Sequence, residues 1–301
     1  MALESAGSPR SFSLAPGLRP GQLAQAACVL EVTARKPGNV HRHADLPGLH
    51  FVDFLLSATA IAEPLDHVGA TGVGRAVLAA IEATRRVVST NTNLGIVLLL
   101  TPLAAVPKSV DIADGIEDVL AATTVDDARD VYRAIRLAHP GGLGEVSDQD
   151  VAREPTMTLR AVMSIAAERD LIAQQYANGF REVLADALPA LKEPLNGGSS
   201  LETAIVSSYL TLLARHPDSL IARKYGIARA TEVSHRAAQL FDVGWPESEE
   251  ARLRFLAFDS WLREPANRLN PGTTADLVTA ALYVALRDGT VMIPFTSSFA
   301  E

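Results

Sequence analysis

Apolar residues recur along most of this chain at the three- and four-residue spacing that marks one face of an α-helix. The first series follows Pro20 and Gly21 and comprises Leu23, Ala26, Ala27 and Leu30. A second series comprises Val77, Ile81, Thr84 and Val88. The same reasoning predicts further helices near residues 52–65, 93–105, 109–123, 125–138, 156–173, 176–190, 199–215, 227–241, 247–264 and 273–288.

Signals for β-strands are weak by comparison. Few runs alternate between apolar and polar residues, and only 5% of the residues are aromatic. The exception, Val291–Phe295, is short and contains Pro294, which a central strand does not accommodate. The sequence therefore predicts an all-α protein.

The turns between the expected helices contain Pro-Gly or Gly-Gly pairs but are too short to be domain linkers. We expect one multi-helix globular domain over residues 20–290. A flexible N-terminal lead at 1–19 precedes it, and a C-terminal tail at 291–301 follows it.

Composition narrows the class of protein. Apolar residues make up 48% of the 301, which is enough for a large core. The formal charge of −8 argues against a general nucleic-acid binder. The lone Cys28 fits a reducing compartment, and neither a signal peptide nor a membrane-spanning run of about 20 apolar residues is found. We expect a cytoplasmic protein that acts neither on nucleic acid nor in a membrane.

The turn after the first helix concentrates charged residues and histidines. Lys36 and the Pro37-Gly38 turn could cradle phosphates with their cation and backbone N–H groups. His41, His43 and Asp45 alternate, so an extended segment would direct all three toward one metal ion. The alternative is a solvated helix C-terminus, where cations are favoured anyway.

Two later segments carry polar side chains next to apolar runs. Asn91 and Asn93 precede the run IVLLL, where they could cap the helix or present amides to a ribose or base. Asp218 lies five residues before Arg223 and six before Lys224, an arrangement that suits phosphate binding or a plain surface ion pair. His139 precedes a flexible Gly-rich turn and is more typical of an exposed loop.

The segment from Asn270 to Asp276 opens the last expected helix. Thr273 could cap that helix, with Asp276 in a role like that of a capping box. A Gly-containing turn at a helix N-terminus is also an anion site, at which Gly272, Thr273 and Thr274 would face a phosphate. Asp276 would then repel the phosphate unless Mg²⁺ bridged them. The sequence leaves both interpretations open.

Taken in order, these turns resemble the triphosphoribosyl-dephospho-CoA synthase family, over roughly residues 22–288. The resemblance rests on short polar motifs rather than on one long signature. They are Lys36-Pro37-Gly38 after the helix with Glu31, His43-x-Asp45, Phe54-x-x-Ser57, Asn91-Thr92-x-x-Gly95, Gly141-Gly142-Leu143, Asp218 with Arg223, and Pro271-Gly272 with Ala275-Asp276-Leu277.

The resemblance implies an all-helical catalytic domain and a Mg²⁺-dependent transfer. The 2′-hydroxyl of dephospho-CoA attacks C1 of the ATP ribose, and adenine leaves. The residues implied as catalytic are Glu31, His41, Asp45 and Asp276. Those implied as Mg²⁺ ligands are Asp45, Asp218 and Asp276. Those implied in substrate and phosphate binding are Lys36, Gly38, Asn91, Asn93, Arg223, Lys224, Asn270, Gly272, Thr273 and Thr274.

Three alternatives accompany this interpretation. Asn39-Val40-His41 stands where the family usually has an apolar residue, Val and Asp, which suggests ribosyl transfer to a different cofactor precursor. A metal-dependent hydrolase would use His41, His43 and Asp45 as ligands. A non-catalytic nucleotide-binding scaffold would have no need of phosphate and metal groups at several separate turns.

Overall fold

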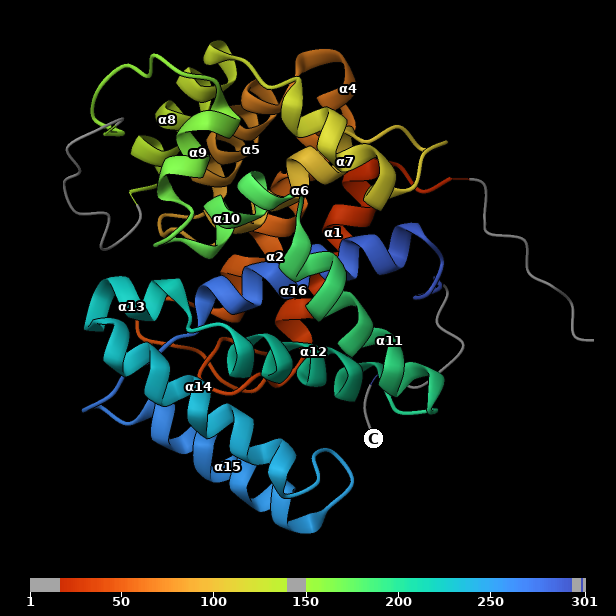
Figure 1. Cartoon of the computed structure of the whole chain (residues 1–301), viewed down its shortest axis with the longest axis vertical. Helices are drawn as coiled ribbons and strands as arrows, with labels where there is room; N and C mark the ends of the chain where they lie inside the picture. The colour runs from red at the N-terminus through yellow and green to blue at the C-terminus, as the bar shows by residue number, and fades with distance from the viewer. Residues whose placement is uncertain (1–16, 140–149, 294–298, 300–301) are drawn as a thin grey trace, which may run out of the picture.

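Helices account for the regular structure throughout residues 17–139, 150–293 and 299, which the computed structural model describes (Figure 1). These residues contain no β-strand, only two isolated bridges that pair His41 with Ala44 and Leu46 with Leu49. The all-α prediction is confirmed. The helices are α1 Pro20–Thr33, α2 Phe51–Ala60, α3 Ala62–Asp66, α4 Val68–Thr71, α5 Val73–Val87, α6 Leu94–Ala105, α7 Ile112–Ala121, α8 Val125–Ala138, α9 Leu159–Ala166, α10 Leu171–Asn178, the π-helix η1 Glu182–Ala187, α11 Leu188–Asn196, α12 Leu201–Arg215, α13 Ser219–Tyr225, α14 Ile227–Asp242, α15 Glu249–Arg263 and α16 Gly272–Arg287.

The centre of the molecule is built from α1, α6 and α16. Almost every residue of α6 is buried, which is expected of a helix that is apolar all round. Helix α16 is nearly as buried and packs against both α1 and α6. None of the helices in the described residues has the length and hydrophobicity needed to cross a bilayer.

Two groups of helices lie on opposite sides of this centre (Figure 1). Helices α4, α5 and α7 to α10 form one group, in which α5 packs closely on α8. That approach requires Gly74, because a Cβ there would lie 2.3 Å from the Cα of Asp127. Helices α11 to α15 form the other group. The N-terminal end of α16 and the short α13 lie where the two groups meet.

Most of the expected helices occur close to their predicted positions. The ranges 93–105, 125–138, 227–241, 247–264 and 273–288 each match a single helix to within two residues. Helical spacing with few internal breakers was sufficient there. The expected lead at 1–19 and tail at 291–301 lie largely outside the described residues.

Three of the expected helices are divided in the structure. The range 52–65 contains both α2 and α3, and the other two are 156–173 and 176–190. The range 156–173 is divided between α9 and α10, since Asp170 accepts hydrogen bonds from the N–H groups of Ile172 and Ala173 and starts a new helix. The range 176–190 is divided as well, because α10 ends at Gly179 in a left-handed conformation and a π-helix follows. There the buried Glu182 carboxylate accepts hydrogen bonds from the amides of Gln174, Gln175 and Asn178.

The segment after α1 is folded into tight turns rather than extended. His41 and Ala44 exchange backbone hydrogen bonds of 3.0 and 2.9 Å. The His41 ring is buried, and its Nδ1 accepts a hydrogen bond from the N–H of His43. Burial lowers the pKa of His41 to about 4, and the nearby positive charges of Arg263 and Lys36 act in the same direction.

This shift predicts a loss of stability in mild acid. The unfolded chain binds a proton at His41 near pH 6.5, whereas the folded protein resists it until about pH 4. The folded state is therefore fully stabilised above pH 6.5 and loses up to about 3 kcal/mol from this group as the pH falls to 4. In urea denaturation, His41→Asn should lose less stability than the wild type over that interval. Equal losses in the two proteins would contradict the assignment.

Candidate active site

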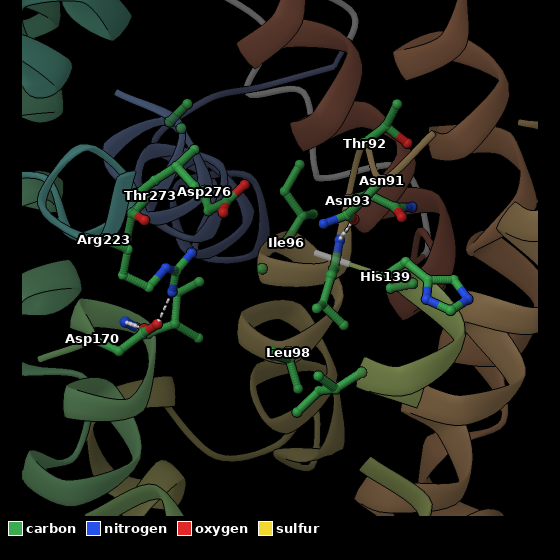
Figure 2. A pocket seen from close by; sticks show the side chains of 18 of the residues that line it. Asn91, Thr92, Asn93, Ile96, Leu98, His139, Asp170, Arg223, Thr273 and Asp276 are labelled. Atoms are coloured by element: carbon green, nitrogen blue, oxygen red, sulfur yellow. Dashed lines mark hydrogen bonds and ion pairs between the residues drawn. The ribbon is translucent and has the colours of Figure 1, made fainter. Parts of the chain in front are cut away.

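A cavity of about 850 Å³ lies where α6, α8, α9 and α10 face α13 and the first turn of α16 (Figure 2). Its size falls within the range of small-molecule sites. Part of its wall is apolar and comes from α6, α8, α9 and α10. The apolar lining residues include Ile96, Leu98, Ile135, Val162, Met163, Ile172 and Ala173.

The polar lining residues are divided between two sides of the cavity. Figure 2 shows one side carrying Asp170, Arg223, Thr273 and Asp276, and the opposite side carrying Asn91 and His139. His139 ends α8 with a left-handed backbone conformation. A ligand that fills the cavity therefore meets charges on one side and amide and imidazole groups on the other.

Asp276 is the most distinctive of these residues. Its carboxylate lies over Gly95 in the first turn of α6, where a Cβ would come within 2.0 Å of Asp276 Oδ2. No hydrogen bond or ion pair to this carboxylate occurs within the described part of the chain. Burial raises its pKa well above the ordinary value, and the negative charges of Glu31, Asp218 and Asp170 raise it further. A cation beside Asp276 would therefore be strongly favoured.

Arg223 supplies the positive charge on the same side. One of its amino groups pairs with Asp170, which also caps α10. Its Nε is buried without a hydrogen-bond partner. Lys224 follows it on α13, is exposed and also lines the cavity. Arg223 and Lys224 thus retain donors for an anionic ligand, and their predicted role in phosphate binding stays a prediction.

Asp218 does not line the cavity and is not arranged as a Mg²⁺ ligand. The side chain is fully buried, and both of its oxygens are engaged. One accepts a hydrogen bond from the N–H of Ile221 (3.0 Å), and the other accepts from the N–H and hydroxyl of Thr274 (2.8 Å each). Asp218 therefore joins α13 to α16, and the alternative of a surface ion pair with Arg223 is wrong too.

The hydrogen bonds from Thr274 to Asp218, called the Asp218 clamp below, also occupy part of the helix terminus that was expected to bind phosphate. The N–H of Thr274 is bonded to Asp218, and the N–H of Gly272 is bonded to the carbonyl of Asn270 (2.8 Å). Thr274 is buried outside the cavity, whereas Asn270, Gly272 and Thr273 line it. Pro271 is the N-cap residue of α16, so neither Thr273 nor Asp276 caps this helix.

Lys36 and Gly38 also lie away from the cavity. The Lys36 ammonium is completely buried, lies 3.0 Å from Glu31 Oε1 and donates to backbone carbonyls, so it is not placed to bind phosphate. Gly38 has a positive φ of 72° and packs against Leu262, while its N–H donates to Asp259. Of the residues expected around this turn, Glu31 lines the cavity.

The histidine and aspartate cluster is only partly assembled: the rings of His41 and His43 lie 6.2 Å apart, whereas Asp45 is engaged elsewhere. Asp45 is half exposed, accepts from the N–H of Phe51 (2.7 Å) and pairs with His50. Those contacts lower the pKa of Asp45, chiefly through the Phe51 hydrogen bond. The His41 ring is buried, and its Nδ1 is occupied by the N–H of His43. Nowhere in residues 17–139, 150–293 and 299 do three or more His, Cys, Asp or Glu side chains form a metal-binding group.

The two asparagines at the start of α6 act locally and still line the cavity. The side-chain oxygen of Asn91 accepts from the N–H of Leu94 (3.1 Å), and the Asn93 amide donates to Thr84 (3.0 Å). The predicted side-chain cap thus fits Asn91, whereas Asn93 is the N-cap residue but makes no side-chain cap hydrogen bond.

Several lining residues escaped the sequence analysis. They are Asn39, Arg85, Arg169 and Asp170. Asp170 carries a recognisable signal, since an Asp before an apolar helical run favours an N-cap. Asn39 lies within the Lys-Pro-Gly turn and donates to Asn270 (2.9 Å), a contact across more than two hundred residues that no local pattern shows. The Gly141-Gly142-Leu143 motif lies outside the described residues.

Comparison with known proteins gives a consistent result. The family model described as ATP:dephospho-CoA triphosphoribosyl transferase (CitG) matches residues 18–293. A Vibrio cholerae protein named probable 2-(5''-triphosphoribosyl)-3'-dephosphocoenzyme-A synthase is 34% identical over 108 residues, which are 36% of this chain and 34% of that protein. A Pectobacterium atrosepticum protein with the same synthase name is 32% identical over 102 residues, 34% of this chain and 32% of its own. The match thus spans about a third of these curated relatives.

A solved structure extends the similarity over most of the fold. The crystal structure of an Archaeoglobus fulgidus protein named for the same synthase activity covers 78% of this chain and 99% of its own, with a TM-score of 0.61 and 26% identity. Because the family model covers nearly the full length, this chain belongs to the ATP:dephospho-CoA triphosphoribosyl transferase family. The resemblance inferred from the ordered motifs is confirmed.

The contact between Gly95 and Asp276 predicts an unusual response to alanine. Gly→Ala in a helix ordinarily stabilises it by about 0.5–1 kcal/mol. Gly95→Ala should instead lower the free energy of unfolding by about 1–3 kcal/mol, because its Cβ overlaps Asp276 and Ile172. Gly69→Ala, which meets nothing within 4 Å, is the matched control. Denaturant melts in which Gly95→Ala is as stable as this control would contradict the close approach.

Proposed function

From the family membership as premise, we propose that this protein transfers the triphosphoribosyl group of ATP to a hydroxyl of dephospho-CoA, in a Mg²⁺-dependent reaction that releases adenine. The observation that carries the proposal is the unpartnered Asp276 carboxylate beside Arg223 in one cavity. A polyphosphate substrate accounts for both groups, since its oxygens suit the guanidinium and its bound cation suits the carboxylate.

Only part of the predicted Mg²⁺ ligand set fits. Asp276 has free oxygens facing the cavity, whereas Asp218 and Asp45 are engaged elsewhere. One protein carboxylate is sufficient, because Mg²⁺ in nucleotide sites is held largely by phosphates and water. We assign Asp276 as the protein ligand; bound there, Mg²⁺ would neutralise charge on the triphosphate.

The cations that line the cavity suit the triphosphate. Arg223 and Lys224 come from α13, and Arg85 and Arg169 also line the cavity. Guanidinium groups bind phosphate oxygens in pairs, and Lys224 adds a point charge. Because the triphosphate stays on the transferred ribose, these contacts hold the ribose while its C1 changes partner.

The transfer itself breaks the bond from ribose C1 to adenine and forms a bond from C1 to the acceptor oxygen. The acceptor hydroxyl loses a proton, and the departing adenine gains one. Positive charge develops on the ribose in between, so a nearby carboxylate stabilises it. Glu31 lines the cavity and is suited to that role or to accepting the hydroxyl proton. The apolar wall from α8, α9 and α10 limits access of water, which would otherwise compete with the acceptor.

The alternatives fare differently. The hydrolase hypothesis required His41, His43 and Asp45 around one metal ion, but Asp45 pairs with His50 and these side chains form no metal-binding group in the described residues. Transfer to another hydroxyl-bearing cofactor precursor remains a second candidate, because Asn39, at a position where this chain departs from the family pattern, lines the cavity.

The direct test is chromatography of free adenine formed from ATP, with and without dephospho-CoA and with and without Mg²⁺. We expect adenine only when ATP, Mg²⁺ and dephospho-CoA are all present. Adenine released with a different hydroxyl acceptor alone would favour the second candidate. No adenine with any acceptor, although calorimetry shows ATP binding, would contradict the proposal.

Asp276→Asn separates a catalytic carboxylate from a structural one. The charged form of Asp276 is disfavoured in the folded protein, so replacing it with an amide should leave the free energy of unfolding at pH 7 unchanged or increase it. Adenine release should fall at least about 100-fold. Asp218→Asn is the matched control: it disturbs the clamp on Thr274 and should cost about 1–3 kcal/mol of stability. Full turnover in Asp276→Asn would rule out its assignment.

A further inference from the structure

Lys36 and Glu31 form a buried ion pair beneath the cavity wall. The sequence analysis expected Lys36 to bind phosphate instead. Lys36 is completely buried, and its Nζ lies 3.0 Å from Oε1 of Glu31, the carboxylate that lines the cavity. The ammonium also donates to the carbonyls of Glu31, Ala34 and Val40. Its three hydrogens are therefore committed to the end of α1 and the turn that follows.

The surroundings fix the position of this ammonium. The hydroxyl of Tyr209 donates to the carbonyl of Pro37 (2.9 Å), and Asp259 accepts from the N–H of Gly38. Glu202, held by Arg35 and Arg42, secures the other side of the same turn. Burying the charges of Lys36 and Glu31 costs desolvation free energy. These contacts give the ion pair the defined geometry that it needs to offset that cost.

We propose that Lys36 is a positioning residue for the transfer reaction: it holds the Glu31 carboxylate at the cavity wall and does not itself contact the substrate. This inference rests on the proposed function, because Glu31 is the group it serves. It replaces the expected phosphate contact of Lys36 with an action through Glu31.

The charges around Glu31 show why a positioning cation is needed. Asp276 approaches from α16, and Cys28 and Tyr209 are buried nearby without positive charge. Burial raises the pKa of Glu31, and the positive charge of Lys36 opposes that effect. The charge of Arg263 lowers the pKa of Lys36, and the charge of Glu202 raises it. Lys36 is thus the cation that compensates Glu31 within this group.

The test is a double-mutant cycle with kinetics and melting measured on each protein. Lys36→Met should lower the melting temperature by roughly 10 °C, because it leaves a buried carboxylate unpaired. It should lower kcat at least about 100-fold and change KM for ATP less than about threefold, since the phosphate-binding cations are untouched. Glu31→Gln should show a similar loss of kcat.

The double variant separates positioning from a purely structural role. Lys36→Met combined with Glu31→Gln removes both charges and should melt at a higher temperature than Lys36→Met alone. Its kcat should match that of Glu31→Gln, because Lys36 then has no carboxylate to position. Recovery of wild-type kcat in the double variant would show that stability alone was limiting and would overturn the proposal. A large rise in KM for ATP with kcat preserved in Lys36→Met would overturn it in favour of direct phosphate binding.

Lys192→Met is the control, since Lys192 pairs with Asp288 and lies neither in the cavity lining nor among the groups that hold Lys36. Its kcat should be unchanged. If the wild type released no adenine with any acceptor, the proposed function would fail separately. A crystal structure of Lys36→Met would still decide the inference: we expect the Glu31 carboxylate to leave its wild-type position, and an unmoved carboxylate would overturn it.

Discussion

The clamp between Asp218 and the first turn of α16 determines what the site can be. One buried carboxylate accepts hydrogen bonds from Ile221 in α13 and from Thr274 in α16, so two helices from distant parts of the chain start at the same point. This arrangement brings Arg223 and Asp276 to one side of the cavity. It also occupies the helix terminus with a carboxylate of the protein, which leaves the side chains of the cavity to bind an anionic ligand.

A second constraint is the accumulation of negative charge. Glu31, Asp170 and Asp276 all line the cavity. Glu31 pairs with Lys36 and Asp170 pairs with Arg223, whereas Asp276 has no partner within the described residues. The charges of Glu31 and Asp170 raise the pKa of Asp276, in addition to the larger effect of its burial. The protein compensates two of them internally and leaves the third open toward the cavity. A substrate that arrives with a divalent cation is the natural complement to this pattern.

Local pattern was sufficient for the fold class and for most helices, because helical spacing and N-cap residues are signals within a few positions. It also singled out Arg223 and Asp276, which both line the cavity, since polar turns beside apolar helices often carry sites. The burial of Lys36 was not predictable, because a Lys-Pro-Gly turn is ordinarily exposed and this one is covered by Tyr209 and by Leu262 of α15. The direction of Asp218 likewise depends on Thr274, which lies 56 residues away.

The central claim is that Asp276 holds the cation of a bound nucleotide. The most direct measurement is a crystal structure of the protein with a non-reactive ATP analogue and Mn²⁺ in place of Mg²⁺, with the metal located by its anomalous scattering. We expect an anomalous peak at coordination distance from Asp276, with the triphosphate reaching Arg223. A peak at Asp45 or Asp218, or a triphosphate bound without any metal near Asp276, would contradict the account.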